Sequence, residues 1–159
     1  MIEKKPKRTK TVRRRKKPAG ALLGLAAADL HAAAPPDEAI ELRRTIEHEG
    51  GSVLAVYREP YGGRWVVMAA LPITQVEPTP YQRNLSETHV RRLETVIGKL
   101  GRFLDPIIAV RATRHVPDSA AYWTPNGSHR LAAMRTLGAK SITAIVVPET
   151  AVAYQISSR

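Results

Sequence analysis

Apolar and polar positions along the chain follow two periods. Apolar residues at helical spacing predict three helices, over 37–49, 87–100 and 128–137. Short runs rich in β-branched and aromatic residues predict strands over 52–57, 65–70, 107–110, 121–124 and 142–147. Strands and helices in this mixed order are typical of a small α/β (α+β) domain with a mixed sheet.

Local signals mark where these elements begin and end. Ser86 is a good N-cap for the helix over 87–100, and Gly101 ends that helix. The segment Pro125-Asn126-Gly127 predicts a tight turn between the strand over 121–124 and the helix that follows. A strand, a turn and a helix therefore meet within a few residues at this point.

Charge changes the interpretation of the N-terminus. The chain has 25 Lys and Arg against 14 Asp and Glu, a net charge of +11. Ten basic residues and one acid, Glu3, give residues 1–20 a charge of +9, which leaves +2 for the other 139 residues. The ten are Lys4, Lys5, Lys7, Arg8, Lys10, Arg13, Arg14, Arg15, Lys16 and Lys17. The high pI therefore reflects a tail and not the folded part.

The first 18 residues have almost no apolar side chains and a dense like charge, so we expect a disordered basic arm. Such an arm would contact DNA phosphates without sequence specificity and with a steep dependence on salt. A solubilising tail and a translated leader are the alternatives. The Ala-rich segment 19–28, followed by Ala32-Ala33-Ala34, also resembles an export signal, but Asp29 and His31 interrupt it.

The composition excludes several classes of chemistry. The chain has no cysteine, which rules out disulfides, thiolate zinc sites and cysteine nucleophiles. His48, His89 and His115 have no spacing typical of metal ligands, so we expect surface histidines and no resident metal site. No apolar run is long enough to span a membrane.

We divide the chain into three parts. Residues 1–18 form the basic tail, residues 19–50 an Ala-rich and amphipathic helical lead-in, and residues 51–159 a domain with its core over 72–148. The segment 151–156 resembles the start of a helix that is cut short. Three alternatives follow: a fragment of a longer protein, a truncated gene product or a stand-alone module.

The turn at Gly127 is the most informative place for chemistry. Ser128, His129 and Arg130 follow it on the first turn of a helix, where free N–H groups and the helix dipole favour an anion. Arg130 has the geometry to neutralise a phosphate, and His129 can donate a hydrogen bond or shuttle a proton. Together with Asn126, these residues are the predicted phosphate site.

Four boxes between Pro72 and Val147 resemble the ParB/sulfiredoxin-like superfamily, specifically the N-terminal domain of ParB-type partition proteins (ParB-like nuclease domain). The first box is the segment 76–83, which reads Val-Glu-Pro-Thr-Pro-Tyr-Gln-Arg. Val90 and Leu93 on a helix form the second, and Gly101 before Pro106-Ile107-Ile108-Ala109-Val110 forms the third. The fourth is the segment 126–133.

The resemblance implies a small mixed-sheet domain that binds a nucleotide triphosphate, CTP or ATP with Mg²⁺, at Asn126–Arg130. It places Gln82 and Arg83 beside the phosphates. The alternative is that Pro78 and Pro80 simply hold an extended connection and that Tyr81 packs half-buried. DNA is implied as a partner, with a homodimer as a further assembly. The implied process is chromosome or plasmid partition in the cytoplasm, at the nucleoid.

This chain departs from the family pattern inside the fourth box. Ser128 stands where ParB proteins often have Glu, His129 where they have Arg, and Ala132 where a further Arg is common. Sulfiredoxin has a catalytic cysteine in this motif, which this chain lacks.

Three function classes therefore stay open. The first is a DNA-associated module that binds a nucleotide. The second is an enzyme: a nucleotide triphosphatase, a small-molecule kinase or a nuclease. A nuclease would need clustered carboxylates for metal ions, whereas Glu77, Glu87, Asp105 and Asp118 are scattered along the chain. The third is an interaction module that uses only the fold.

Overall fold

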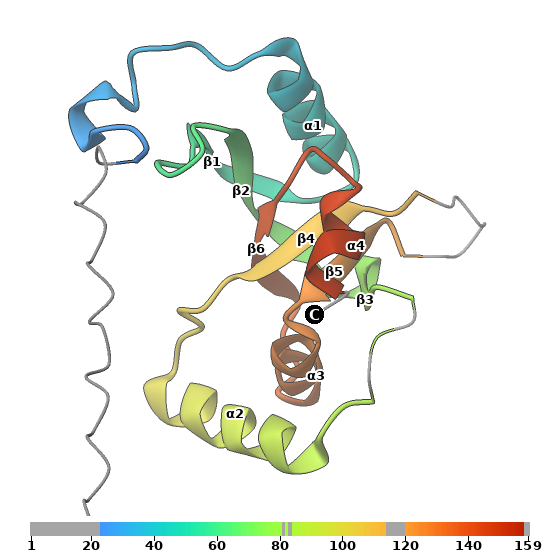
Figure 1. The fold of residues 1–159 in the computed structure, drawn as a ribbon. Coiled ribbons are helices and arrows are strands. Elements are labelled where there is room, and N and C mark those ends of the chain that lie inside the picture. Colours follow the sequence, from blue (N-terminus) through green and yellow to red (C-terminus); the bar gives the residue numbers. More distant parts are fainter. Residues whose placement is uncertain (1–22, 81, 83, 114–119, 158–159) are drawn as a thin grey trace, which may run out of the picture.

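The computed structural model describes residues 23–80, 82, 84–113 and 120–157. In this part of the chain the strands form one mixed sheet in the order β1-β2-β6-β4-β5-β3 (Figure 1). The strands are β1 (Ser52–Arg58), β2 (Trp65–Pro72), β3 (Val76–Pro78), β4 (Ile107–Arg111), β5 (Tyr122–Asn126) and β6 (Ser141–Val146). Strands β4 and β6 pair in parallel, as do β3 and β5, and the other neighbours are antiparallel. The predicted mixed α/β fold is confirmed.

Helices lie on both faces of this sheet. They are α1 (Asp37–His48), α2 (Glu87–Leu100), α3 (Ser128–Thr136) and α4 (Val152–Ser157), with short 3₁₀ turns at η1 (Ala27–Asp29) and η2 (Ile73–Gln75). Each predicted helix and each predicted strand is present, with ends that differ by a residue or two. The periodicity of the sequence therefore predicted the elements correctly.

Two clusters of buried side chains show which helix covers which face. The larger cluster joins Leu42 and Ile46 of α1 and Leu131 of α3 to the strands, including Ala109. The smaller cluster joins Ala153 of α4 to Val110 and Trp123. Because successive strand residues face opposite sides, Ala109 and Val110 assign α1 and α3 to one face and α4 to the other.

Helix α1 was grouped with the lead-in from its sequence, yet it packs on the sheet. Ala39 and Ile46 are fully buried. At its C-terminal end, the Glu49 carboxylate accepts hydrogen bonds from the Tyr122 hydroxyl (2.7 Å) and from Arg111. Burial, and then the hydrogen bond and charge of Glu49, raise the pKa of Tyr122, so its hydroxyl stays protonated as the donor. This network ties α1 to β4 and β5.

One predicted turn is wrong in its extent. Pro125 and Asn126 belong to β5, because Asn126 still pairs with Ile108 of β4 and only Gly127 leaves the strand. The first three residues of the first box, 76–78, form β3, which lies parallel to β5 with Val76 beside Tyr122. The reversal between β5 and α3 is therefore sharper than the sequence suggests.

Helix α2 stands apart from this core. None of its residues is buried in the described part of the chain, and its contacts are mainly with α3. It begins at the predicted N-cap: the Ser86 hydroxyl accepts a hydrogen bond from the backbone N–H of His89 (3.4 Å). Figure 1 shows α2 on the far side of α3 from the sheet.

Candidate functional site

The site is built on the reversal at Gly127. This residue has φ 135°, a conformation that L side chains rarely adopt. A Cβ atom here would lie 2.7 Å from the Cβ of Ile107, so the backbone comes too close to β4 for any side chain. Helix α3 starts at Ser128, and no described side chain caps its first turn. The N–H groups at this end of the helix are therefore without a described side-chain cap.

A cavity of about 310 Å³ opens at this point. Asn126, Gly127, His129 and Arg130 line it from the β5–α3 junction. Its other walls come from elsewhere in the chain: His89, Leu93 and Asp105. Small-molecule sites usually occupy roughly 300–1,000 Å³, so this cavity lies at the small end of that range.

Arg130 already has protein partners in this structure. Its Nη1 donates to the backbone carbonyls of Asp105 (3.0 Å) and Pro106 (2.8 Å) and lies 2.8 Å from the Asp105 carboxylate. Its Nη2 donates to the Asn126 side-chain oxygen (3.1 Å). The Arg130 side chain is only 16% exposed, whereas that of Asp105 is 80% exposed. Arg130 therefore joins α3 to the start of β4, and a ligand would compete with Asp105 for its charge.

His129 faces the N-terminus of α2. Its Nε2 accepts a hydrogen bond from the backbone N–H of Ser86 (3.1 Å), which requires that this nitrogen carry no proton. The His89 ring meets the His129 ring edge-on with centroids 4.8 Å apart. Burial, and then the neighbouring His89, lower the pKa of His129. Neutral His129 thus carries its proton on Nδ1, where it can donate to an acceptor.

The structure brings together four of the predicted site residues and separates others. Asn126, Gly127, His129 and Arg130 share the cavity, while Ser128 does not line it. Gln82 points to β5 instead: its amide nitrogen donates to the carbonyl of Thr124 (3.0 Å), and its amide oxygen is buried with no described partner. Arg83, Tyr81 and the ten basic residues of the arm lie outside the described residues.

Sequence reasoning missed three residues of this site. His89 was predicted as a surface histidine, which its exposure confirms, but it also lies at the cavity against His129. Asp105 and Leu93 were treated as a scattered acid and a core position. The position of His89 one turn into the predicted helix, next to the Ser86 cap, was the only available signal.

The donor set fits an anion better than a metal ion. No group of three or more His, Asp or Glu side chains in the described part of the chain could hold a metal. The cavity instead offers a guanidinium, an imidazole N–H and the helix N-terminus, which are phosphate ligands. Asp105 is the carboxylate that lines it among the residues the structure describes, and it could contact a Mg²⁺ ion carried by a phosphate chain.

Comparison with known proteins gives a likeness of fold. No protein-family model matches the chain, and no curated protein does. The chain is similar to the C-terminally truncated chromosome-partitioning protein ParB from Caulobacter crescentus complexed with CTP-gamma-S (24% identity, TM-score 0.47, covering 57% of this chain and 49% of that chain). It is similar to sulfiredoxin from Arabidopsis thaliana (22% identity, TM-score 0.43, covering 58% and 97%).

A second structure of the Caulobacter crescentus ParB, complexed to the centromeric parS site, is also similar (23% identity, TM-score 0.41, covering 54% of this chain and 42% of that chain). The alignments thus span about half of the ParB chains or less. ParB and sulfiredoxin are also the proteins that the sequence boxes resemble. At these identities it is a resemblance of fold alone.

Proposed function

We propose that this protein is a DNA-associated module that binds the phosphates of a nucleotide at the β5–α3 junction. The observation that carries the proposal is the cavity in which Gly127, His129 and Arg130 meet at the uncapped start of α3. Backbone N–H groups, a guanidinium and an imidazole N–H all donate hydrogen bonds, as phosphate oxygens require. The choice of a CTP-type nucleotide with Mg²⁺, over ATP, rests on the sequence boxes.

In this proposal Arg130 neutralises the phosphate and His129 donates to it. The Nε2 lone pair of His129 is already used by the N–H of Ser86, and Nδ1 carries the proton. A histidine whose Nε2 lone pair is occupied and whose Nδ1 is protonated acts as a hydrogen-bond donor and not as a general base. We therefore favour binding over hydrolysis, with triphosphatase activity as the alternative.

The basic arm makes the second contact in this proposal. Its charge of +9 lies within the first 20 residues, and the rest of the chain is close to neutral. Non-specific attraction to DNA phosphates follows from that separation. A role in chromosome or plasmid partition, at the nucleoid in the cytoplasm and as a homodimer, belongs to the same proposal. Among the described residues, every helix is too short or too polar to cross a membrane.

Equilibrium binding of CTP, ATP and GTP with Mg²⁺ tests the phosphate site, with tripolyphosphate as a probe of the phosphates alone. We expect Arg130→Ala and His129→Ala to weaken tripolyphosphate binding about tenfold or more, as the loss of a charge-assisted hydrogen bond implies. Arg91→Ala is the matched control, because Arg91 is exposed on α2 and does not line the cavity.

Arg130 also joins two elements, so its variant is first checked by a urea melt. Should it fail to fold, His129→Ala decides the test, because His129 accepts only one backbone hydrogen bond. Equal affinity of the wild type and His129→Ala for tripolyphosphate would contradict the site. A full-length variant with the ten basic arm residues changed to Gln should lose DNA binding and its salt dependence.

A further inference from the structure

A second pocket lies at the opposite end of the sheet, under a segment of chain that precedes α1. This segment, residues 23–36, is called the strap here. The backbone N–H of Leu25 donates to the carbonyl of Pro60 (2.7 Å) in the β1–β2 hairpin. Arg58 of β1 donates from Nε (3.3 Å) and Nη2 (3.2 Å) to the carbonyl of Leu30, and also to that of Asp29. These bonds hold the strap against the hairpin.

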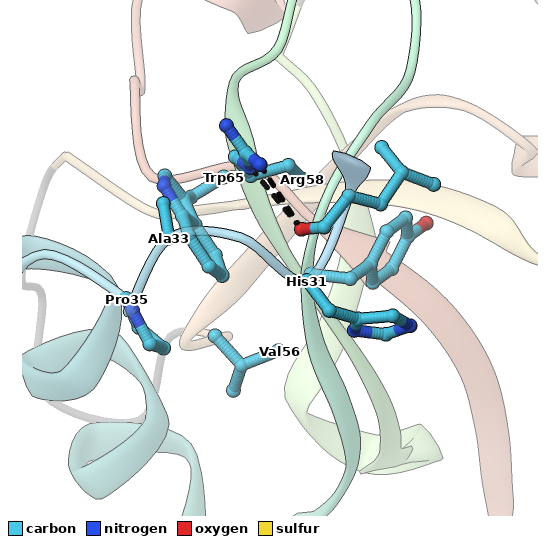
Figure 2. A pocket seen from close by; sticks show the side chains of 8 residues that line it. His31, Ala33, Pro35, Val56, Arg58 and Trp65 are labelled. Carbon is cyan, nitrogen blue, oxygen red and sulfur yellow. Dashed lines mark hydrogen bonds between the residues drawn. The ribbon is translucent and has the colours of Figure 1, made fainter. Parts of the chain in front are cut away.

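The pocket between the strap and the hairpin has a volume of about 210 Å³. Figure 2 shows Trp65 and Pro35 on one side, His31 across from them, and Val56 at the base. Tyr57 also lines it, so three of its side chains carry aromatic rings. The pocket therefore has the lining of a site for a flat ring.

The charge of the residues around the pocket favours some flat-ring ligands over others. Arg58 lines the pocket, and its guanidinium carbon lies 5.9 Å from the centre of the Trp65 ring. Among the described residues, no carboxylate lines it: the nearby Glu59 accepts hydrogen bonds from the backbone N–H groups of Tyr61, Gly62 and Arg64 within the hairpin loop. A cationic ligand is therefore disfavoured, and a neutral ring attached to an anion is favoured.

The strap is also continuous with the basic arm. Lys17 precedes Leu23, the first described residue of the strap, by six positions, a distance of at most about 20 Å even in a fully extended chain. Phosphates held by the arm would therefore lie within reach of the pocket. A base of a duplex stays stacked and paired, whereas a base of a single strand can enter an aromatic pocket.

We propose that the strap pocket takes an unstacked base of single-stranded nucleic acid whose phosphates contact the basic arm. Trp65 supplies the stacking surface, and Arg58 holds the strap that forms the opposite wall. The inference rests on the proposed contact between arm and nucleic acid, and it adds a preference for single strands. Aromatic stacking strengthens binding about fivefold or more per base, so it should be visible beside the electrostatic attraction.

The test compares an oligothymidylate with an abasic oligonucleotide of equal length, both bound to the full chain. We expect the wild type to bind the oligothymidylate about tenfold more tightly. Trp65→Leu should bind both strands with the affinity that the wild type has for the abasic one. Tyr61→Leu is the matched control, because Tyr61 is an exposed aromatic residue of the same hairpin that does not line the pocket.

Equal binding of the two strands by the wild type, with loss of both in the arm variant, would overturn the pocket and leave the arm's role intact. If neither strand binds, the arm's role fails, and a titration with free thymidine decides on the pocket. Saturable quenching of tryptophan fluorescence that is lost in Trp65→Leu would support it, since Trp123 is buried and remains as a reference. The pocket proposal would be overturned if thymidine caused no quenching. It would also be overturned if N-acetyl-phenylalaninamide quenched the fluorescence and thymidine did not.

Discussion

Helices α2 and α3 lie side by side at the candidate phosphate site, yet they are attached to the molecule in different ways. Helix α3 buries Leu131 and Ala133, and Leu131, which is 1% exposed, belongs to the main core. Helix α2 buries none of its described residues, and Val96 and Leu100 remain more than half exposed. The site therefore has one fixed wall, which holds the phosphate donors, and one wall that depends on few contacts.

This difference suggests that the two helices have different roles at the site. Elements with few buried apolar contacts open at low free energy, whereas core elements open only with the whole domain. Ligand donors on α3 would keep their geometry while α2, with His89 and Leu93, moves toward or away from the cavity. The predictions below test this contrast, starting with the largest expected effect.

Truncating one leucine in each helix tests the contrast directly. Leu131→Ala should lower the free energy of unfolding by about 2–5 kcal/mol, because it leaves a cavity in the core. Leu93→Ala, at a half-buried position of α2, should cost about 1 kcal/mol or less. Urea denaturation measures both. Similar losses for the two variants would contradict the loose attachment of α2.

Glycine substitutions make the same comparison in the backbone. Gly127→Ala should destabilise the protein by about 2–4 kcal/mol, because its φ is positive and the new Cβ collides with Ile107. Gly98→Ala in α2 is the matched control: its Cβ would meet nothing within 4 Å, and alanine favours the helix. We expect that control to gain about 0.5–1 kcal/mol in the same denaturation experiment. If Gly127→Ala left the free energy of unfolding unchanged, the argument for a close approach of the backbone to β4 would fail.

Asp105 faces the cavity and competes for Arg130. Asp105→Asn removes the negative charge beside the guanidinium, so tripolyphosphate should bind about three- to tenfold more tightly in the absence of Mg²⁺. Isothermal titration calorimetry measures the change. Glu87→Gln, which removes an exposed acid of α2 paired with Arg91, should leave the affinity within twofold of the wild type. Weaker binding by Asp105→Asn would mean that this carboxylate helps to hold the ligand.

The smallest expected effect is on the dependence of stability on pH. Burial, with the neighbouring His89, lowers the pKa of His129 below its usual 6.5. The unfolded chain therefore takes up a proton at this residue before the folded chain does, and stability falls as the pH drops below about 6.5. Urea midpoints at about pH 7.5 and 5.5 should differ less in His129→Gln than in the wild type. An equal difference in the two proteins would contradict this prediction.

The candidate site could be predicted from the sequence where its residues are neighbours in the chain. Asn126, Gly127, His129 and Arg130 were identified because a turn followed by a helix start places them together by local geometry alone. Asp105 and His89 could not be found in this way. Asp105 reaches Arg130 only because Arg130 also bonds to the backbone at the start of β4, and His89 reaches His129 only because α2 packs on α3.

The strap pocket shows the same limit. Its segment was predicted as an Ala-rich lead-in from composition, and Trp65 and Tyr57 as residues of two strands. Nothing in the local pattern indicates that Arg58 donates to carbonyls 28 and 29 residues earlier in the chain. The pairing of β1 with β2 and the position of the strap on that hairpin create the pocket.

The sequence by itself determined the helices and strands, the basic arm and the absence of cysteine chemistry, because periodicity, composition and charge are local properties of the chain. Only the tertiary structure decided that α1 belongs to the main core, that Arg130 is paired with Asp105, and that aromatic rings from the strap and the hairpin share one pocket. These facts depend on contacts between segments far apart in the chain. Such contacts form only when the sheet has brought together the apolar faces of its strands and helices.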